Sequence, residues 1–274
     1  MPTIGVFDSG FGGLTVLKAL MEVVPGAAYL YFGDTARLPY GSKSSETVAR
    51  YACEAARFLE HQGAELLVVA CNTATALALD EINQATSVEV LGVIGPGVER
   101  ATAASKRRKV VVIGTEATIS SHAYQNALLS CHIEAREKAC PLLVPLVEEG
   151  WVDHPVTEEV ARIYLNEAFA EDFGSADVLL LGCTHYPLLK PLLRRVVPQG
   201  VALVDSAESM AQAVRSLVTS PGRLAPSLSP SSQQTPGQNS PQFFVTDSVE
   251  KFRRLGSLFL GCQVRDITHV DLKE

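Results

Sequence analysis

The feature that most constrains the fold is a series of short, nearly continuous apolar runs separated by stretches with helical patterning. Strands that are buried on both faces of a parallel sheet have this pattern, whereas half-solvated strands alternate between apolar and polar residues. The alternation of strands and helices therefore predicts an α/β fold with mainly parallel sheets flanked by helices. The expected strands are 4–7, 29–32, 66–70, 90–94, 110–113, 178–181 and 201–204. The expected helices are about 14–24, 44–61, 75–84, 96–105, 120–130, 156–172, 188–195 and 208–218.

A change in composition marks the C-terminal part of the chain. Residues 220–241 are rich in Pro, Ser and Gln and carry few large apolar side chains, which predicts a mobile loop. One more strand, 243–245, and a short helix around 248–258 are expected after it.

Charge and composition exclude several classes of function. The 274 residues include 23 basic and 30 acidic side chains, and 47% of them are hydrophobic, as in a folded globular protein. This acidic balance argues against nucleic acid as the principal partner, because phosphate contacts require clustered Lys and Arg. No run reaches the roughly 18 apolar residues of a membrane-spanning helix, and the N-terminus shows no secretory signal, so we expect no membrane association and a cytoplasmic location. None of the six cysteines forms a CxxC pair or a zinc-type spacing, so no metal site is expected.

Two segments of the sequence resemble each other. LLVVACNTAT (66–75) and VLLLGCTHYP (178–187) each consist of a buried-strand run, a small residue, a cysteine and polar residues. Their cysteines, Cys71 and Cys183, lie about one small domain apart in the sequence. We expect two similar α/β lobes that face each other across a cleft, each with a thiol at the carboxyl end of a strand. The first lobe would comprise 1–95 with 208–274, and the second 96–207.

The residues that follow these cysteines favour a functional role. Asn72–Thr73 and Thr184–His185 suit a strand-to-helix turn, where backbone NH groups at a helix N-terminus favour a thiolate and bind carboxylates. Ligands of parallel α/β sheets also bind at the carboxyl ends of strands. The remaining cysteines are interpreted as packing residues; they are Cys53, Cys131, Cys140 and Cys262.

Three further loops follow expected strands. IGVFDSGFGGLTVLKAL (4–20) places Asp8 and Ser9 before a glycine-rich turn, but its spacing matches neither a dinucleotide fingerprint nor a P-loop, so a small polar ligand fits better. YFGDTARLPYGSKS (31–44) offers backbone NH and hydroxyl groups in its Pro-Tyr-Gly-Ser turn. VIGTEATISSHAY (112–124) clusters Thr115, Thr118 and Ser120 before a helix, where N-capping is the alternative role.

Together these segments resemble the glutamate racemases, which belong to the cofactor-independent amino-acid racemases. The matching motifs span residues 4–189 in the expected order; they are FDSGFGGLTV, YFGDTARLPYGSKS, VVACNTATALAL, VIGTEATI and LLLGCTHYPLL. The resemblance implies interconversion of L- and D-glutamate without pyridoxal phosphate or metal, D-glutamate for the peptidoglycan of the cell wall, and a homodimer. Cys71 and Cys183 would be the paired acid and base groups, one on each face of the substrate.

The resemblance also assigns supporting residues. Asp8 would assist the first thiol and His185 the second, and the segment PLLVPLVEEG (141–150) would supply an assisting glutamate, Glu148 or Glu149, with Glu148 favoured. The expected substrate-binding residues are Asp8, Ser9, Pro39, Tyr40, Gly41, Ser42, Asn72, Thr73, Thr118, Thr184 and His185.

Two alternatives stay open at this point. The first is another activity of the same superfamily, namely an aspartate or hydantoin racemase or a malonate decarboxylase. A decarboxylase needs only one proton-delivering thiol, so the two retained cysteines argue against a decarboxylase. The second is a non-catalytic binding protein on this fold, which intact Asp8, Cys71, Cys183 and His185 disfavour.

Overall fold

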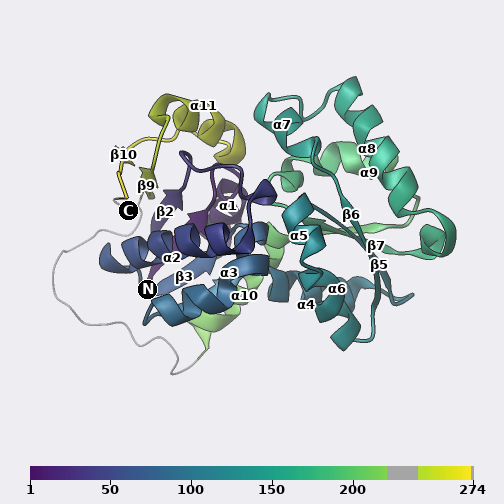
Figure 1. The fold of residues 1–274 in the computed structure, drawn as a ribbon, viewed down its shortest axis with the longest axis horizontal. Coiled ribbons are helices and arrows are strands. Elements are labelled where there is room, and N and C mark those ends of the chain that lie inside the picture. Colours follow the sequence, from purple (N-terminus) through teal and green to yellow (C-terminus); the bar gives the residue numbers. More distant parts are fainter. Residues whose placement is uncertain (221–239, 273–274) are drawn as a thin grey trace.

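The computed structural model describes residues 1–220 and 240–272. It contains two sheets in which every strand pairing among the described residues is parallel (Figure 1). The first sheet has the order β10-β9-β2-β1-β3-β4 and the second has the order β6-β5-β7-β8. The predicted α/β fold with mainly parallel sheets is confirmed.

The two sheets use different parts of the chain. The first consists of β1 (Thr3–Asp8), β2 (Ala28–Gly33), β3 (Leu66–Val69), β4 (Glu89–Gly92), β9 (Gln242–Val245) and β10 (Ile267–His269). The second consists of β5 (Lys109–Gly114), β6 (Glu134–Ala139), β7 (Val178–Gly182) and β8 (Ala202–Asp205). The lobe boundaries at 95/96 and 207/208 stay a prediction. The expected loop 220–241 lies, for residues 221–239, outside the described part of the chain.

Helices cover both sheets and connect them. They are α1 (Leu14–Val23), α2 (Ser45–His61), α3 (Asn72–Ala85), α4 (Ile94–Ala104), α5 (Glu116–Ser120), α6 (Ala123–Ser130), α7 (Leu143–Glu148), α8 (Pro155–Ala168), α9 (Lys190–Val196), α10 (Ser206–Thr219) and α11 (Val249–Leu260). The short 3₁₀ turns are η1 (Tyr40–Ser42), η2 (Glu171–Ser175) and η3 (Tyr186–Leu189).

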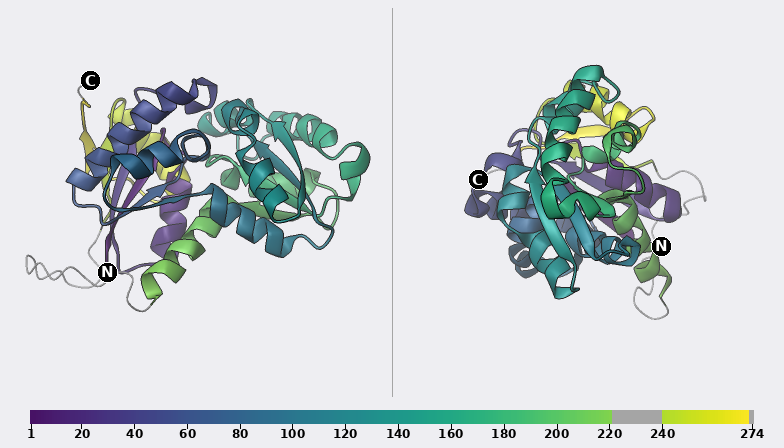
Figure 2. Two further views of the ribbon diagram at one scale, coloured as in Figure 1. Left: turned by 60° about the horizontal axis from the view of Figure 1, so that its bottom comes forward. Right: turned by 90° about the vertical axis from the view of Figure 1, so that its right-hand side faces the viewer.

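Two helices join the lobes (Figures 1 and 2). α4 follows β4 of the first sheet but packs against β7 and β8 of the second. α10 follows β8 of the second sheet but packs against α1 of the first, and α4 and α10 also pack against each other. The relative position of the two lobes therefore rests on these packed helices and on the contacts across the cleft.

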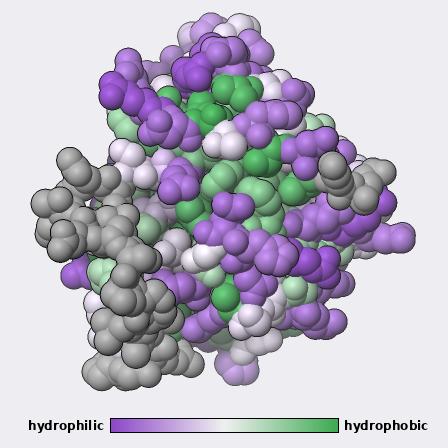
Figure 3. Space-filling model, turned by 90° about the vertical axis from the view of Figure 1, so that its left-hand side faces the viewer, coloured by the Kyte–Doolittle hydropathy of each residue, from purple (hydrophilic) through white to green (hydrophobic). Residues whose placement is uncertain are grey.

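The core explains why the inner strands read as continuous apolar runs. β3 and β7 are buried at every position, and β1 and β5 at every position after their first, because helices cover both faces of each sheet. The outer end of the first lobe presents mainly hydrophilic residues with small hydrophobic patches between them (Figure 3). No helix in 1–220 or 240–272 is long and apolar enough to cross a membrane.

Several predicted element boundaries are wrong. The strand expected at 90–94 ends at Gly92, because Val93 and Ile94 are buried at the start of α4, where Pro96 is tolerated in the first turn. α3 begins at Asn72 rather than 75 because Cys71 caps it. The helix expected at 120–130 is divided into α5 and α6 at His122, whose φ of 55° is left-handed.

Other elements were not predicted or were predicted too long. β6 has the sequence EAREKA and lacks an apolar run because it is an edge strand. α7 and β10 are short and were also missed. The helix expected at 156–172 ends at Ala168, and η2 follows it.

Candidate active site

Cys71 and Cys183 line one cavity of about 180 Å³ between the lobes. Cys71 is separated from the end of β3 by one residue, and Cys183 directly follows β7, so each sheet contributes one thiol from the carboxyl end of an inner strand. The two thiols thus come from matching positions in the two lobes, as the repeated sequence pattern predicts. The lining residues are Ser9, Gly10, Phe11, Leu38, Pro39, Tyr40, Gly41, Ser42, Cys71, Asn72, Thr73, Thr115, Glu116, Pro141, Val144, Pro145, Glu148, Cys183, Thr184 and His185.

Cys71 is the N-cap of α3. Its sulfur accepts a hydrogen bond from the backbone NH of Ala74 at 3.5 Å, and its thiol donates to Ser9 Oγ at 3.4 Å. The sulfur therefore lies at the positive end of the α3 dipole, where negative charge is stabilised.

Burial and a nearby carboxylate oppose that effect. Asp8 ends β1 behind the cavity wall, where it accepts hydrogen bonds from the Gly10 NH at 2.9 Å and from Thr184 Oγ1 at 3.4 Å. Burial raises the pKa of Asp8. Burial, followed by the charge of Asp8, raises the pKa of Cys71 to about 12. Cys71 is consequently a neutral thiol, able to donate a proton, before substrate is bound.

Cys183 has a different environment. Its sulfur lies 3.9 Å from Nδ1 of His185, and Nε2 of His185 lies 3.2 Å from Oε1 of Glu148. Burial disfavours the protonated imidazole, but Cys183 and Glu148 outweigh it and raise the pKa of His185 to about 10. A protonated imidazole beside Cys183 stabilises negative charge on that sulfur. The two thiols therefore line the same cavity with neighbours of opposite charge, the Asp8 carboxylate near Cys71 and the His185 imidazolium beside Cys183.

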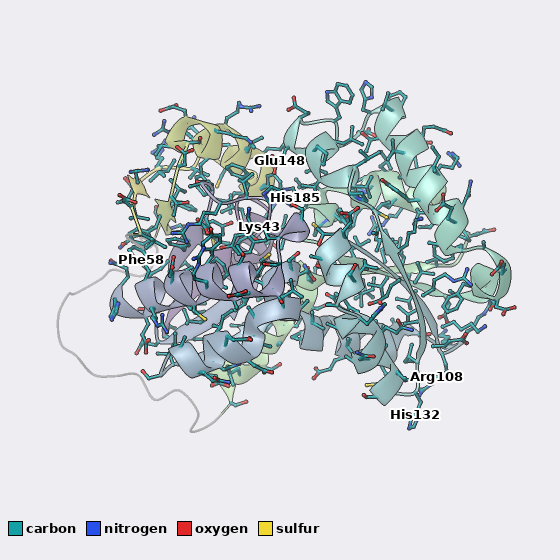
Figure 4. The ribbon with its side chains drawn as sticks, viewed as in Figure 1. Lys43, Phe58, Arg108, His132, Glu148 and His185 are labelled. Atoms are coloured by element: carbon teal, nitrogen blue, oxygen red, sulfur yellow. The ribbon has the colours of Figure 1, made fainter. Side chains whose placement is uncertain are left out.

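Glu148 is held between two cations. Burial acts against its ionisation, but His185 and Lys251 outweigh burial and lower the pKa of Glu148. Its second carboxylate oxygen lies 3.4 Å from Nζ of Lys251 on α11. Figure 4 shows Glu148 and His185 close together where the two lobes meet. Of the two glutamates considered from the sequence, Glu148 contacts His185, whereas Glu149 is exposed.

Polar side chains in the wall are held by partners from the other lobe. The amide of Asn72 donates to Ser206 Oγ at 3.3 Å and accepts from the Tyr124 hydroxyl at 2.6 Å. Thr73 Oγ1 lies 2.9 Å from that of Thr115 and 3.1 Å from that of Thr118. These bonds fix the first turn of α3 beside Cys71.

Two glycines of the first loop permit close approaches, Gly12 between the lobes and Gly13 within the first lobe. A Cβ at Gly12 would overlap the side chains of Thr184 and His185, and a Cβ at Gly13 would lie 2.5 Å from Cβ of Asp8. Packing against the Cys183 loop therefore requires glycine at position 12, which the sequence pattern did not indicate, and packing against Asp8 requires it at position 13.

The structure brings most of the predicted site residues to the cavity and places two behind its wall. Asp8 and Thr118 are buried and do not line it, although Asp8 bonds to Thr184, and Thr118 bonds to Thr73. The predicted residues that line it are Ser9, Pro39, Tyr40, Gly41, Ser42, Cys71, Asn72, Thr73, Glu148, Cys183, Thr184 and His185.

Sequence reasoning missed several residues of the site. Lys251 lies on a helix remote in the sequence, and nothing in its local pattern distinguishes it. The unpredicted lining residues are Gly10, Phe11, Leu38, Thr115, Glu116, Pro141, Val144 and Pro145. All eight lie within the sequence motifs of the loops described above, and this position in the motifs is the signal that the sequence offers for them. Within the described ranges, no group of three or more His, Cys, Asp or Glu side chains could hold a metal ion.

The chain is similar over most of its length to proteins of known activity. Residues 4–214 match the family described as Asp/Glu/hydantoin racemase. The chain is 60% identical to a glutamate racemase of Koribacter versatilis, with 99% of this chain and 98% of the relative covered. Among solved structures, the glutamate racemase of Francisella tularensis in complex with D-glutamate is similar with a TM-score of 0.87 and 36% identity, covering 99% of this chain and 98% of that one. The Thermus thermophilus glutamate racemase in complex with β-chloro-D-alanine has a TM-score of 0.85 and 46% identity, covering 99% and 97%.

Proposed function

The chain belongs to the Asp/Glu/hydantoin racemase family, and we propose that it is an isomerase that interconverts L- and D-glutamate with two thiols as acid and base. The observation that supports this mechanism best is that Cys71 and Cys183, from corresponding strands of different lobes, line one cavity with different neighbours. Racemisation requires a proton to leave one face of the α-carbon and another to arrive on the opposite face. One sulfur on each face meets that requirement directly.

The charge states around the thiols indicate how a reaction cycle starts. The raised pKa of His185 keeps a positive charge beside Cys183, while burial and Asp8 raise the pKa of Cys71 and keep it protonated. The Cys183 thiolate removes the α-proton and becomes a thiol, and the Cys71 thiol donates its proton to the other face and becomes a thiolate. The reverse direction uses the same groups with their roles exchanged. By the family resemblance, Cys183 is the base for L-glutamate and Cys71 the base for D-glutamate.

The rest of the cavity suits an amino acid with two carboxylates. Backbone NH groups in the first turn of α3 and the hydroxyls of Ser9, Thr73 and Thr184 are donors for carboxylate oxygens. The proposal also assigns substrate binding to Asp8, Asn72 and His185 and to the turn 39–42. Thr118 would act indirectly, by its hydrogen bond to Thr73.

The biological role proposed here follows from the product. D-glutamate would enter cell-wall peptidoglycan, and the enzyme would act in the cytoplasm as a homodimer without a cofactor. The oligomeric state is tested by light scattering on the eluting protein, where a monomer mass would contradict the dimer.

The test of the activity is circular dichroism of purified protein with L-glutamate, with L-aspartate and with buffer alone. The expected result is loss of optical activity with L-glutamate until equal amounts of the enantiomers are present, and much slower change with L-aspartate. Faster turnover of L-aspartate would reassign the substrate, and no turnover of either would overturn the proposed activity.

A further inference from the structure

The Cys183 side of the site contains a charged group that comes from the other lobe. Cys183, His185 and Glu148 belong to the lobe with β5–β8, whereas Lys251 lies on α11, which follows β9 of the first sheet. Nζ of Lys251 lies 3.4 Å from Glu148 Oε2, and the other oxygen of Glu148 lies 3.2 Å from Nε2 of His185. The chain of contacts Lys251–Glu148–His185–Cys183 therefore starts in one lobe and ends at a thiol of the other.

The same helix makes a second contact with this chain. The ring of Phe259 packs edge-on against the imidazole of His185, with 5.2 Å between ring centroids. α11 thus contacts both His185 and its carboxylate partner, from positions two helical turns apart. Two independent contacts from one helix indicate that α11 helps to orient the imidazole.

Lys251 is also fixed on the side of its own lobe. Its ammonium lies 5.2 Å from the centre of the Phe11 ring, which lines the cavity, and Phe11 packs against Phe252 at 5.8 Å. The side chain of Glu148 is 18% exposed and that of Lys251 is 41% exposed, so the ion pair is partly shielded from water at the cleft. Partial burial makes its interaction stronger than that of a fully exposed pair.

We propose that Lys251 is a positioning residue for proton transfer at Cys183. This inference rests on the proposed function. Lys251 holds Glu148 ionised and oriented so that one carboxylate oxygen stays on Nε2 of His185, and His185 then presents Nδ1 to the sulfur of Cys183. Because the ammonium comes from the opposite lobe, the arrangement is complete only when α7 and α11 lie side by side. Lys251 itself does not touch the reacting atoms.

The test compares Lys251→Met with Lys251→Arg, Glu148→Gln and the double variant. Arg254→Met is the matched control, because Arg254 is exposed on the same helix and its loss removes the same charge. Each protein is assayed with L- and D-glutamate and with the α-deuterated forms of both. Since the equilibrium constant between enantiomers is one, any loss of kcat/KM must be equal in the two directions, so the isotope effects carry the information about which thiol is affected.

For Lys251→Met we expect kcat/KM to fall about three- to tenfold, as a partly exposed charge pair allows. The primary isotope effect should rise for the enantiomer whose proton Cys183 removes and fall for the other. Lys251→Arg should retain most of the activity. The double variant should lose little more than Glu148→Gln alone, since both changes break one chain of contacts. Arg254→Met should behave as wild type.

Two results would overturn the positioning role. One is a Lys251→Met variant with the kcat/KM and isotope effects of wild type. The other is a loss of activity with equal isotope-effect changes for both enantiomers, which is what a general packing defect would produce.

The wild-type enzyme in the same assay distinguishes failure of the proposed function from failure of the positioning role. If wild type does not racemise glutamate, the proposed function is wrong. If wild type is active and Lys251→Met is unaffected, only the positioning role of Lys251 is wrong. Far-ultraviolet circular dichroism of each variant monitors folding, and Lys251→Gln, which removes the charge but keeps a polar side chain, replaces Lys251→Met if that variant folds poorly.

Discussion

Single residues account for the difference between the two thiols. Cys71 is buried near a carboxylate, and Cys183 lies beside an imidazole that is itself held by Glu148. Both sulfurs have polar neighbours within hydrogen-bond reach, yet the charges around them are opposite in sign. Two chemically identical groups are thereby given different electrostatic surroundings.

Removing either thiol should abolish racemisation. Cys71→Ala and Cys183→Ala each leave one face of the substrate without a proton donor or acceptor, and general acid–base groups contribute about 10²–10⁴-fold. Circular dichroism with L-glutamate measures the loss, and Cys53→Ala, on α2 away from the cavity, is the control. A Cys71 or Cys183 variant that kept more than about a tenth of wild-type turnover would contradict the two-thiol mechanism.

The His185–Glu148 pair should stabilise the fold in a defined range of pH. Folding raises the pKa of His185 from 6.5 to about 10. The protonated imidazole therefore makes its full contribution to the free energy of unfolding below pH 6.5, and this contribution is lost as the pH rises through about 10. The lowered pKa of Glu148 sets the acid limit, because that contribution is lost as the pH falls through the folded value. The greater stability of wild type over Glu148→Gln should therefore be present near neutral pH and disappear around pH 10.

Urea unfolding at a series of pH values measures this difference. Glu149→Gln is the control, since Glu149 is the neighbouring, exposed glutamate and should follow wild type. A constant difference between wild type and Glu148→Gln up to pH 11 would show that the imidazole is not the group responsible.

At the scale of elements, the site depends on helices that begin where inner strands end. Cys71 lies between β3 and α3, and the polar loop after Cys183 leads through η3 into α9. A helix also begins at the end of the edge strand β8, where Asp205 caps α10 by accepting a hydrogen bond from the Glu208 NH at 2.8 Å. Asp205 is buried and also pairs with Lys190 on α9.

Loss of this cap should destabilise the connection between the lobes. Asp205→Ala removes the capping bond and leaves the ammonium of Lys190 without its buried partner, so we expect the free energy of unfolding to fall by about 2–4 kcal/mol. Asp205→Asn keeps a capping oxygen and should lose less. The midpoint of urea unfolding measures both changes. An Asp205→Ala protein as stable as wild type would show that α10 is held by its packing against α1 and α4 alone.

At the scale of the whole molecule, the cavity is a property of both lobes together. Its walls are linked across the cleft by bonds such as Thr15 Oγ1 to the carbonyl of Thr184 at 2.9 Å and Tyr124 to Asn72. A ligand that contacts both walls stabilises their relative position as well as its own contacts.

Glutamate should consequently stabilise the folded protein. Binding at a concentration of 100 times Kd adds about 2.7 kcal/mol to the free energy of unfolding. The measurement is urea unfolding of Cys71→Ala with and without L-glutamate, because this variant cannot convert the ligand during the experiment. L-lysine, which carries the opposite side-chain charge, is the control. Equal stabilisation by both amino acids would mean that the cavity does not select a dicarboxylate.

The sequence by itself determined the class of fold, the inner strands and the two thiols at strand ends. These features depend on residues that are adjacent in the sequence. Burial on both faces makes a strand apolar throughout, and Cys71 and Cys183 follow such apolar runs. The edge strand β6 could not be found this way, because exposure removes the apolar run. The full-length similarity to glutamate racemases confirms the family expected from the motifs.

Only the tertiary structure decided which residues complete the site. Lys251 and Glu148 are 103 positions apart, and Asp8 and Thr184 are 176 positions apart. No helical or strand period connects such positions, so their contact depends on how the two sheets and the helices α4 and α10 pack. The chemical groups are encoded residue by residue, whereas their distances, their burial and hence the charge states of Cys71 and His185 arise only when the lobes are brought together.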